Sequence, residues 1–149
     1  MQQRSSRDNA GVVLRVAVAL CLVVDAAVHL HLARGYQQSA PSGIGAGNLF
    51  RIQAVFALGV AVWLAWRGGR AAFLAAFAVG VSAVAAVVLY RYVNVPAIGP
   101  LPAMYEPVWF AEKTLSAVAE GVAAAGALLA LSLTTGRSSA PRHGGPTRN

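Results

Sequence analysis

An aspartate and two histidines interrupt an otherwise apolar stretch near the N-terminus, VVDAAVHLHLA at residues 23–33. Asp25 and His29 are four residues apart, so a helix would place both side chains on one face. A carboxylate beside an imidazole can ligate a metal ion or exchange protons. His31 would point about 200° away from His29 on such a helix, and we expect it at the membrane surface.

Each of three later segments carries polar residues that can meet this pair. Glu112, Ser116 and Glu120 repeat every four residues and would form a polar stripe on one helix. The predicted polar cluster consists of Asp25, His29, Arg51, Gln53, Arg91, Glu112, Lys113, Ser116 and Glu120.

The elements that position these residues are apolar helices. The chain has 149 residues, of which 57% are hydrophobic and 11% charged, whereas soluble domains carry about 25% charged residues. Runs at about 12–33, 49–66, 71–90 and 108–133 are each long enough to span a bilayer. The sequence therefore predicts an all-α polytopic bundle of four helices in the lipid bilayer. Lys113 is the only lysine beside eleven arginines, and this composition, rich in Ala, Gly and Val, suggests a GC-rich bacterial genome and hence a bacterial plasma membrane.

The basic residues predict the orientation of this bundle. With the N-terminus inside, eight arginines lie on the inner side and four basic residues on the outer side. This asymmetry favours cytoplasmic termini, and it accounts for the net charge of +7 without a nucleic-acid partner. Residues 1–11 and 134–149 are polar and are expected to be disordered cytoplasmic ends.

In this orientation the ionisable residues gather in the outer half of the bundle. Four acidic residues there can balance four basic ones, namely Asp25, Glu106, Glu112 and Glu120 against Arg34, Arg51, Arg91 and Lys113. An unpaired charge at the bilayer centre costs about 2.5–3.5 kcal/mol on insertion scales. We therefore expect the charges to face the interior of the bundle and to pair there.

Three interpretations of the cluster stay open. It is a salt-bridge network that holds the helices together, a metal site, or a site that handles protons or binds a small polar or quinone-like ligand. The metal site would use Asp25 and His29 with Glu112 or Glu120, and would suit zinc, iron or manganese. A single inward histidine and the nearby arginines argue against a cation, and the sequence names no cofactor.

The last connection, residues 91–107, contains four prolines and several apolar residues, so an ordered cap is expected over the end of the bundle. Tyr105, Glu106 and Trp109 belong to this cap. They would form a lid over the cluster, a docking surface for a partner, or an aromatic belt at the membrane interface.

The segments LFRIQA (49–54), LYRYV (89–93) and MYEPVWFAEKTLSAVAE (104–120) resemble small uncharacterised membrane proteins of high-GC Gram-positive bacteria. In organisation the chain is also similar to the DoxX-like four-helix proteins. The resemblance covers residues 12–133 and transfers no catalytic residue. A DoxX-like relationship would imply an accessory subunit in a redox or membrane-protection complex.

No nucleophile–base pair, phosphate-binding glycine loop or haem-attachment motif occurs in the chain. The leading functional prediction is a non-enzymatic accessory or interaction subunit that contacts another membrane protein or a second copy of itself. The alternative is a binding or transport protein for a proton, a metal ion or a small polar or quinone-like ligand.

Overall fold

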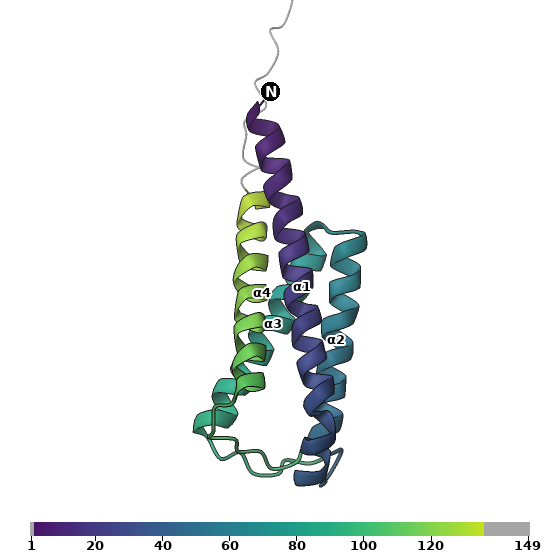
Figure 1. Cartoon of the computed structure of the whole chain (residues 1–149), viewed down its shortest axis with the longest axis vertical. Coiled ribbons are helices and arrows are strands. Elements are labelled where there is room, and N and C mark those ends of the chain that lie inside the picture. The colour runs from purple at the N-terminus through teal and green to yellow at the C-terminus, as the bar shows by residue number, and fades with distance from the viewer. Residues whose placement is uncertain (1, 136–149) are drawn as a thin grey trace, which may run out of the picture.

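A computed structural model describes residues 2–135, which fold into four helices joined in antiparallel succession (Figure 1). Their bounds are α1 Gln2–Ser39, α2 Ala46–Trp66, α3 Gly69–Tyr92 and α4 Ala111–Thr135. The prediction of an all-helical chain with four long apolar helices is confirmed. The start of α1 and the end of α4 lie at one end of the bundle, and the cap lies at the other.

The first helix is longer than the sequence predicted. It includes residues 2–11, for which disorder was expected, and it continues past residue 33 to Ser39. No proline interrupts the chain before Pro41, and the added turns contact α2, where Gln37 Oε1 accepts a hydrogen bond from the Asn48 amide at 3.1 Å. Of the predicted disordered tail, residues 134–149, the first two belong to α4, and residues 136–149 lie outside the described residues.

Small side chains form the core of the bundle. α1 packs against α2 and α4, and α3 packs mainly against α4 and then α2. The fully buried positions include Ala54, Ala57, Ala72, Ala76, Ala123 and Ala127. Alanine and glycine let helix backbones approach closely, which is how helices associate where there is no water to drive burial.

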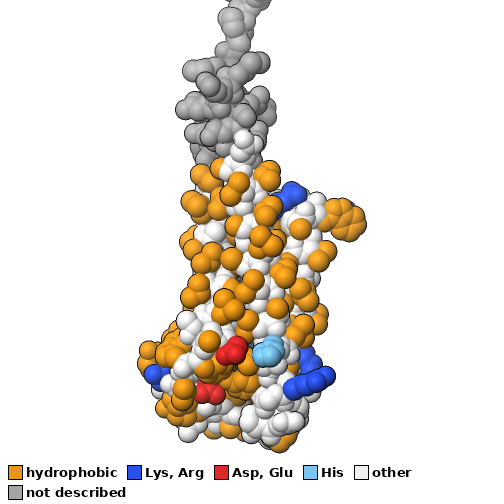
Figure 2. All heavy atoms as spheres, in the orientation of Figure 1, with side chains coloured by type: hydrophobic (Ala, Val, Ile, Leu, Met, Phe, Trp, Pro, Cys, Tyr) orange, Lys and Arg blue, Asp and Glu red, His pale blue; other side chains and the backbone are white. Residues whose placement is uncertain are grey.

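The outer surface of the bundle is apolar, as Figure 2 shows for one face. Large hydrophobic side chains are exposed along all four helices, including Val55, Leu74, Val118 and Leu128. Each helix is long and apolar enough to cross a membrane. The charged side chains visible in Figure 2 gather mostly near the cap end.

The turn between α2 and α3 is the tightest connection. Gly68 and Gly69 have positive φ angles of 59° and 85°, a conformation that L side chains rarely adopt. Arg15 from α1 reaches this end of α2 and donates a hydrogen bond to the Ala65 carbonyl at 2.9 Å. The arginine therefore satisfies one of the free carbonyls at the helix end.

Residues 93–110 form the cap. Two isolated antiparallel bridges, Val95 with Met104 and Ile98 with Leu101, fold the cap back on itself without a strand in the described part of the chain. The Glu106 amide donates to the Tyr90 carbonyl at 2.9 Å, and the Pro100 carbonyl accepts from the Ile44 amide at 2.9 Å. The cap is therefore tied to α3 and to the loop between α1 and α2.

At Gly80 the backbones of α3 and α4 approach each other closely. A Cβ atom at this position would lie 2.8 Å from the Glu120 carbonyl oxygen and 3.1 Å from the Ala124 nitrogen. We expect Gly80→Ala to destabilise the bundle by about 1–3 kcal/mol, because two backbones must separate. Denaturant unfolding in detergent micelles measures this loss.

Gly121→Ala is the matched control, since a Cβ atom there meets nothing within 4 Å. It should be neutral or stabilising by up to about 1 kcal/mol, because alanine favours the helix. Equal losses in the two variants would contradict the close packing of α3 on α4.

Candidate functional site

A group of buried polar side chains lies where α1, α2 and α4 meet. We call it the polar centre; its members are Asp25, His29, Gln53, Ser116 and Glu120. Oδ1 of Asp25 lies 2.8 Å from Nδ1 of His29 and 2.9 Å from the Ser116 hydroxyl oxygen. Oδ2 of Asp25 accepts a hydrogen bond from the Gln53 amide at 3.3 Å. The Asp25 carboxylate is fully buried, and both of its oxygens have partners.

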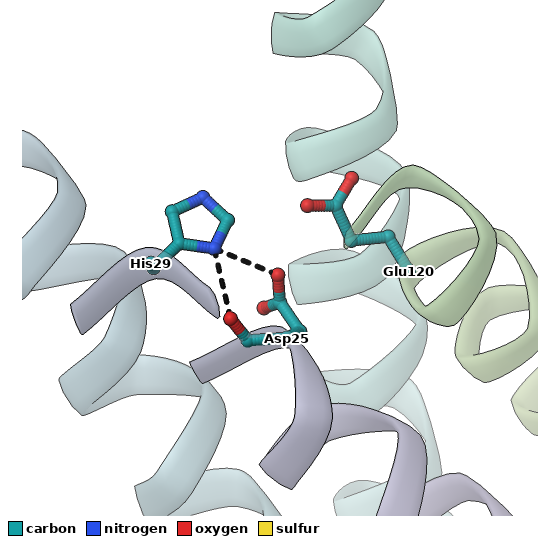
Figure 3. Close-up of side chains that lie close together, drawn as sticks. All are labelled: Asp25, His29 and Glu120. Atoms are coloured by element: carbon teal, nitrogen blue, oxygen red, sulfur yellow. Dashed lines mark hydrogen bonds and ion pairs between the residues drawn. The ribbon is translucent and has the colours of Figure 1, made fainter. Parts of the chain in front are cut away.

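Glu120 occupies the inner edge of this group. Its side chain has no exposed surface, and Oε1 lies 2.8 Å from the Ser116 hydroxyl oxygen. Its second oxygen, Oε2, is buried without a hydrogen-bond partner among the described residues. Figure 3 shows Asp25 and His29 on one helix, with the Glu120 carboxyl group facing them from another.

Four residues of the predicted cluster lie apart from the polar centre: Arg51, Arg91, Glu112 and Lys113. Arg51 is exposed, and its guanidinium donates to Asn48 Oδ1 at 2.6 Å. Arg91 stacks over the Tyr92 ring at 5.2 Å. Glu112 is partly exposed and forms no hydrogen bond or ion pair with the described residues.

The expected balance of four acidic and four basic residues does not form. Among the side chains that the structure describes, those of residues 9–133, the only contact with ion-pair geometry is that of Asp25 Oδ1 with His29 Nδ1, at 2.8 Å, and it carries two charges only when His29 is protonated. Lys113 is buried, but its ammonium group donates to the carbonyl oxygens of Glu106 at 2.5 Å and of Val108 at 3.3 Å. The cap backbone, and not a carboxylate of the polar centre, therefore satisfies this lysine.

A cavity of about 320 Å³ lies beside the polar centre and extends to the cap. Most of its surface is apolar or aromatic, with Leu32, Phe50, Val87 and Phe110 among the lining residues. His29, Gln53 and Ser116 line it, whereas Asp25 and Glu120 do not. Ligand sites of soluble and membrane proteins combine these features, an apolar wall and a few converging polar groups.

A second set of polar groups lines the cavity at the cap. The Tyr36 hydroxyl donates to Glu106 Oε2 at 3.2 Å, and Lys113 holds the Glu106 carbonyl from the other side. Tyr36, Glu106 and Lys113 all line the cavity, as does Tyr90 at the end of α3. The cavity therefore has hydrogen-bonding groups at its inner end and at its cap end, with hydrocarbon between them.

The other predicted cap residues face outward. Tyr105 is 51% exposed and Trp109 is 47% exposed, and neither lines the cavity. Lys113 lies over the Trp109 ring at 5.3 Å. His31, predicted at the membrane surface, is exposed.

Asp25, His29 and Glu120 are the group best placed to hold a metal ion. One potential ligand atom from each lies within 4.8 Å of the others. Glu112 or Glu120 was predicted from the sequence as the third ligand, and the structure places Glu120 in this position. The Ser116 hydroxyl lies among these groups, and Nδ1 of His29 already contacts the Asp25 backbone carbonyl at 3.0 Å.

Two aromatic residues of the cavity were missed by the sequence analysis. Tyr36 lies seven residues after His29, on the same face of α1, and its ring is 4.3 Å from that of Phe50. The Phe50 ring also packs edge-on against His29 at 5.0 Å. Extending the first helix to Ser39 would have revealed Tyr36 by its helical spacing.

Comparisons with protein-family models, with curated proteins and with solved structures gave no match.

The Tyr36 hydroxyl is a direct side-chain link between α1 and the cap. We expect Tyr36→Phe to loosen the cap, because Glu106 loses its donor, at a cost of about 1.5–3 kcal/mol for a hydrogen bond to a charged group. Hydrogen–deuterium exchange should rise at residues 93–110. The control is Tyr105→Phe, whose side chain is exposed; equal exchange in both variants would contradict this role.

Proposed function

We propose that this protein spans the bacterial plasma membrane and binds a small amphipathic molecule with a quinone-like ring in the cavity beside the polar centre. The observation that carries the proposal is the cavity itself, about 320 Å³ of space with an apolar wall and polar groups at both ends. The apolar outer surface and the four long helices support membrane insertion.

The orientation follows from the distribution of basic residues, which favours cytoplasmic termini. The cap and the cavity would then lie on the outer side of the membrane. A molecule dissolved in the bilayer or arriving from outside would reach the cavity without crossing the cytoplasmic half of the bundle.

The lining favours a flat ring with oxygen atoms at opposite ends. Phe50, Tyr90 and Phe110 supply aromatic surface, which packs well against another ring. His29 at the inner end and Lys113 at the cap end are donors, and a carbonyl oxygen accepts hydrogen bonds from such groups. A ring with two carbonyl groups satisfies both ends and leaves its apolar body against Leu32 and Val87.

An accessory role in a membrane complex is the second proposal. It is supported by the cap, where Ile98, Tyr105 and Trp109 are 59%, 51% and 47% exposed. The DoxX-like resemblance implies the same role in a redox complex, and a quinone-like ligand is compatible with it. Binding in the cavity and docking on the cap use different surfaces, so the two can be tested separately.

Filling the cavity tests the first proposal. Ala86 lines the cavity, whereas Ala85 is exposed on the same helix. We expect Ala86→Phe to weaken binding of menadione, a naphthoquinone without a prenyl tail, by at least about tenfold, equal to 1.4 kcal/mol. Calorimetry in lipid nanodiscs measures the affinity, and thermal unfolding checks that the variant is folded.

Ala85→Phe is the control and should bind menadione as the unchanged protein does. Failure of the unchanged protein to bind, or equal affinities in the two variants, would contradict the cavity as the binding site. Either result would leave the accessory role as the better proposal.

A further inference from the structure

Three close contacts join four side chains into one chain of hydrogen bonds. Glu120 Oε1 lies 2.8 Å from the Ser116 hydroxyl oxygen, which lies 2.9 Å from Asp25 Oδ1. Asp25 Oδ1 in turn lies 2.8 Å from His29 Nδ1. Each of the four atoms in this hydrogen-bonded series can donate or accept, depending on whether it carries a hydrogen. The three distances therefore limit which of these atoms carry one.

His29 carries a hydrogen on Nδ1. This nitrogen lies 3.0 Å from the Asp25 backbone carbonyl oxygen and 2.8 Å from Asp25 Oδ1. A carbonyl oxygen can only accept, so the nitrogen facing it must donate. The other ring nitrogen, Nε2, points away from Asp25 in Figure 3. Because His29 lines the cavity and Asp25 does not, Nε2 is the nitrogen available to a molecule inside.

Ser116 has one hydroxyl hydrogen but two carboxyl groups within hydrogen-bond distance. Asp25 accepts from His29, Gln53 and Ser116, a set of donors that fits an ionised carboxylate. With the Ser116 hydrogen directed at Asp25, the contact to Glu120 needs a hydrogen on Glu120 Oε1. Glu120 is therefore a neutral acid that donates to Ser116.

The unpartnered oxygen of Glu120 supports this assignment independently. Oε2 is buried and has no donor among the described residues. Burying an ionised oxygen without a donor costs far more than burying the carbonyl oxygen of a neutral acid. No arginine or lysine among the described side chains of residues 9–133 forms an ion pair with either carboxyl group.

The charge that remains is that of Asp25, and the imidazolium form of His29 balances it. Helix α1 contributes Asp25 and His29, α4 contributes Ser116 and Glu120, and α2 contributes the uncharged Gln53. α3 approaches the Glu120 backbone at Gly80, which has no side chain, and it lines the cavity with Ser82 and Tyr90. Glu106, Lys113 and Tyr36 face the cavity from its cap end. A protonated His29 thus makes the polar centre electrically neutral.

We propose that protonated His29, paired with Asp25 and next to a neutral Glu120, uses its Nε2–H to select a molecule with a hydrogen-bond-accepting carbonyl oxygen. This inference rests on the proposed function and specifies its ligand class, the oxidised, carbonyl-bearing ring. The hydroxyl oxygen of the reduced ring can also accept from Nε2–H, but its hydrogen then finds no lone pair on a protonated imidazole. That hydrogen is left without a partner at His29, whereas a carbonyl oxygen leaves no donor unpaired.

The protonation of Glu120 can be tested without a ligand. Infrared spectra of the protein in nanodiscs should contain the C=O stretch of a buried carboxylic acid, and Glu120→Gln should remove it. Glutamine can still donate to Ser116, so this variant keeps the hydrogen bond and is expected to fold. Ser116→Ala is the control and should shift the band but keep it. Absence of the band, or its survival in Glu120→Gln, overturns the inference.

Elemental analysis of the purified protein tests the competing metal site. We expect no stoichiometric metal. A divalent ion at one per chain that is lost in Glu120→Gln would overturn the inference, because a cation would then balance the two carboxylates.

The ligand preference is tested with menadione, its reduced form menadiol, and methylnaphthalene, which has the same ring system without oxygen. We expect menadione to bind about tenfold or more tightly than menadiol, and His29→Phe to abolish this difference while methylnaphthalene binding is unchanged. Equal binding of menadione and menadiol to the unchanged protein overturns the inference and leaves the proposed function standing. Failure of all three probes to bind contradicts the proposed function. The infrared experiment needs no ligand, so it tests the protonation of Glu120 whether or not the proposed function is correct.

Discussion

The buried carboxylate of Asp25 is the constraint on which the rest of the structure depends. A charge inside an apolar bundle is tolerated only when donors surround it, and here they come from three helices. His29 lies on α1 itself, Gln53 on α2 and Ser116 on α4. Each donor has to reach the same side chain, so this contact fixes the depth of α2 and α4 relative to α1.

The core on the inner side of Asp25 and the cavity on its outer side follow from this arrangement. Towards the turn between α2 and α3, the buried residues are mostly alanines, and the helices pack closely. Towards the cap, larger side chains such as Phe50 and Phe110 line a space of about 320 Å³. The polar centre lies at the boundary, with Asp25 and Glu120 inside the packed region and His29 at the cavity.

The lengths of the four hydrophobic runs were sufficient to predict the four helices. In a 149-residue chain of this composition, apolar runs of this length are explained by membrane-spanning helices. Spacing of four residues also placed Asp25 with His29 and Ser116 with Glu120. Arg51 and Gln53 were both predicted to face the interior of the bundle. Side chains two positions apart on a helix point about 200° away from each other, and only Gln53 faces Asp25. Glu112 has the right spacing but lies in the first turn of α4, where its side chain is partly exposed. Spacing gives a direction around a helix, whereas depth in the bundle depends on packing that the sequence does not display.

A double-mutant cycle between Asp25 and Ser116 tests most directly whether this carboxylate couples α1 to α4. Unfolding free energies in detergent micelles would be measured for Asp25→Ala, Ser116→Ala and the double variant. We expect a coupling energy of about 0.5–3 kcal/mol, as for residues in one hydrogen-bond network, and none between Asp25 and the exposed Ser132. Strict additivity for Asp25 and Ser116 would contradict the central role of this contact.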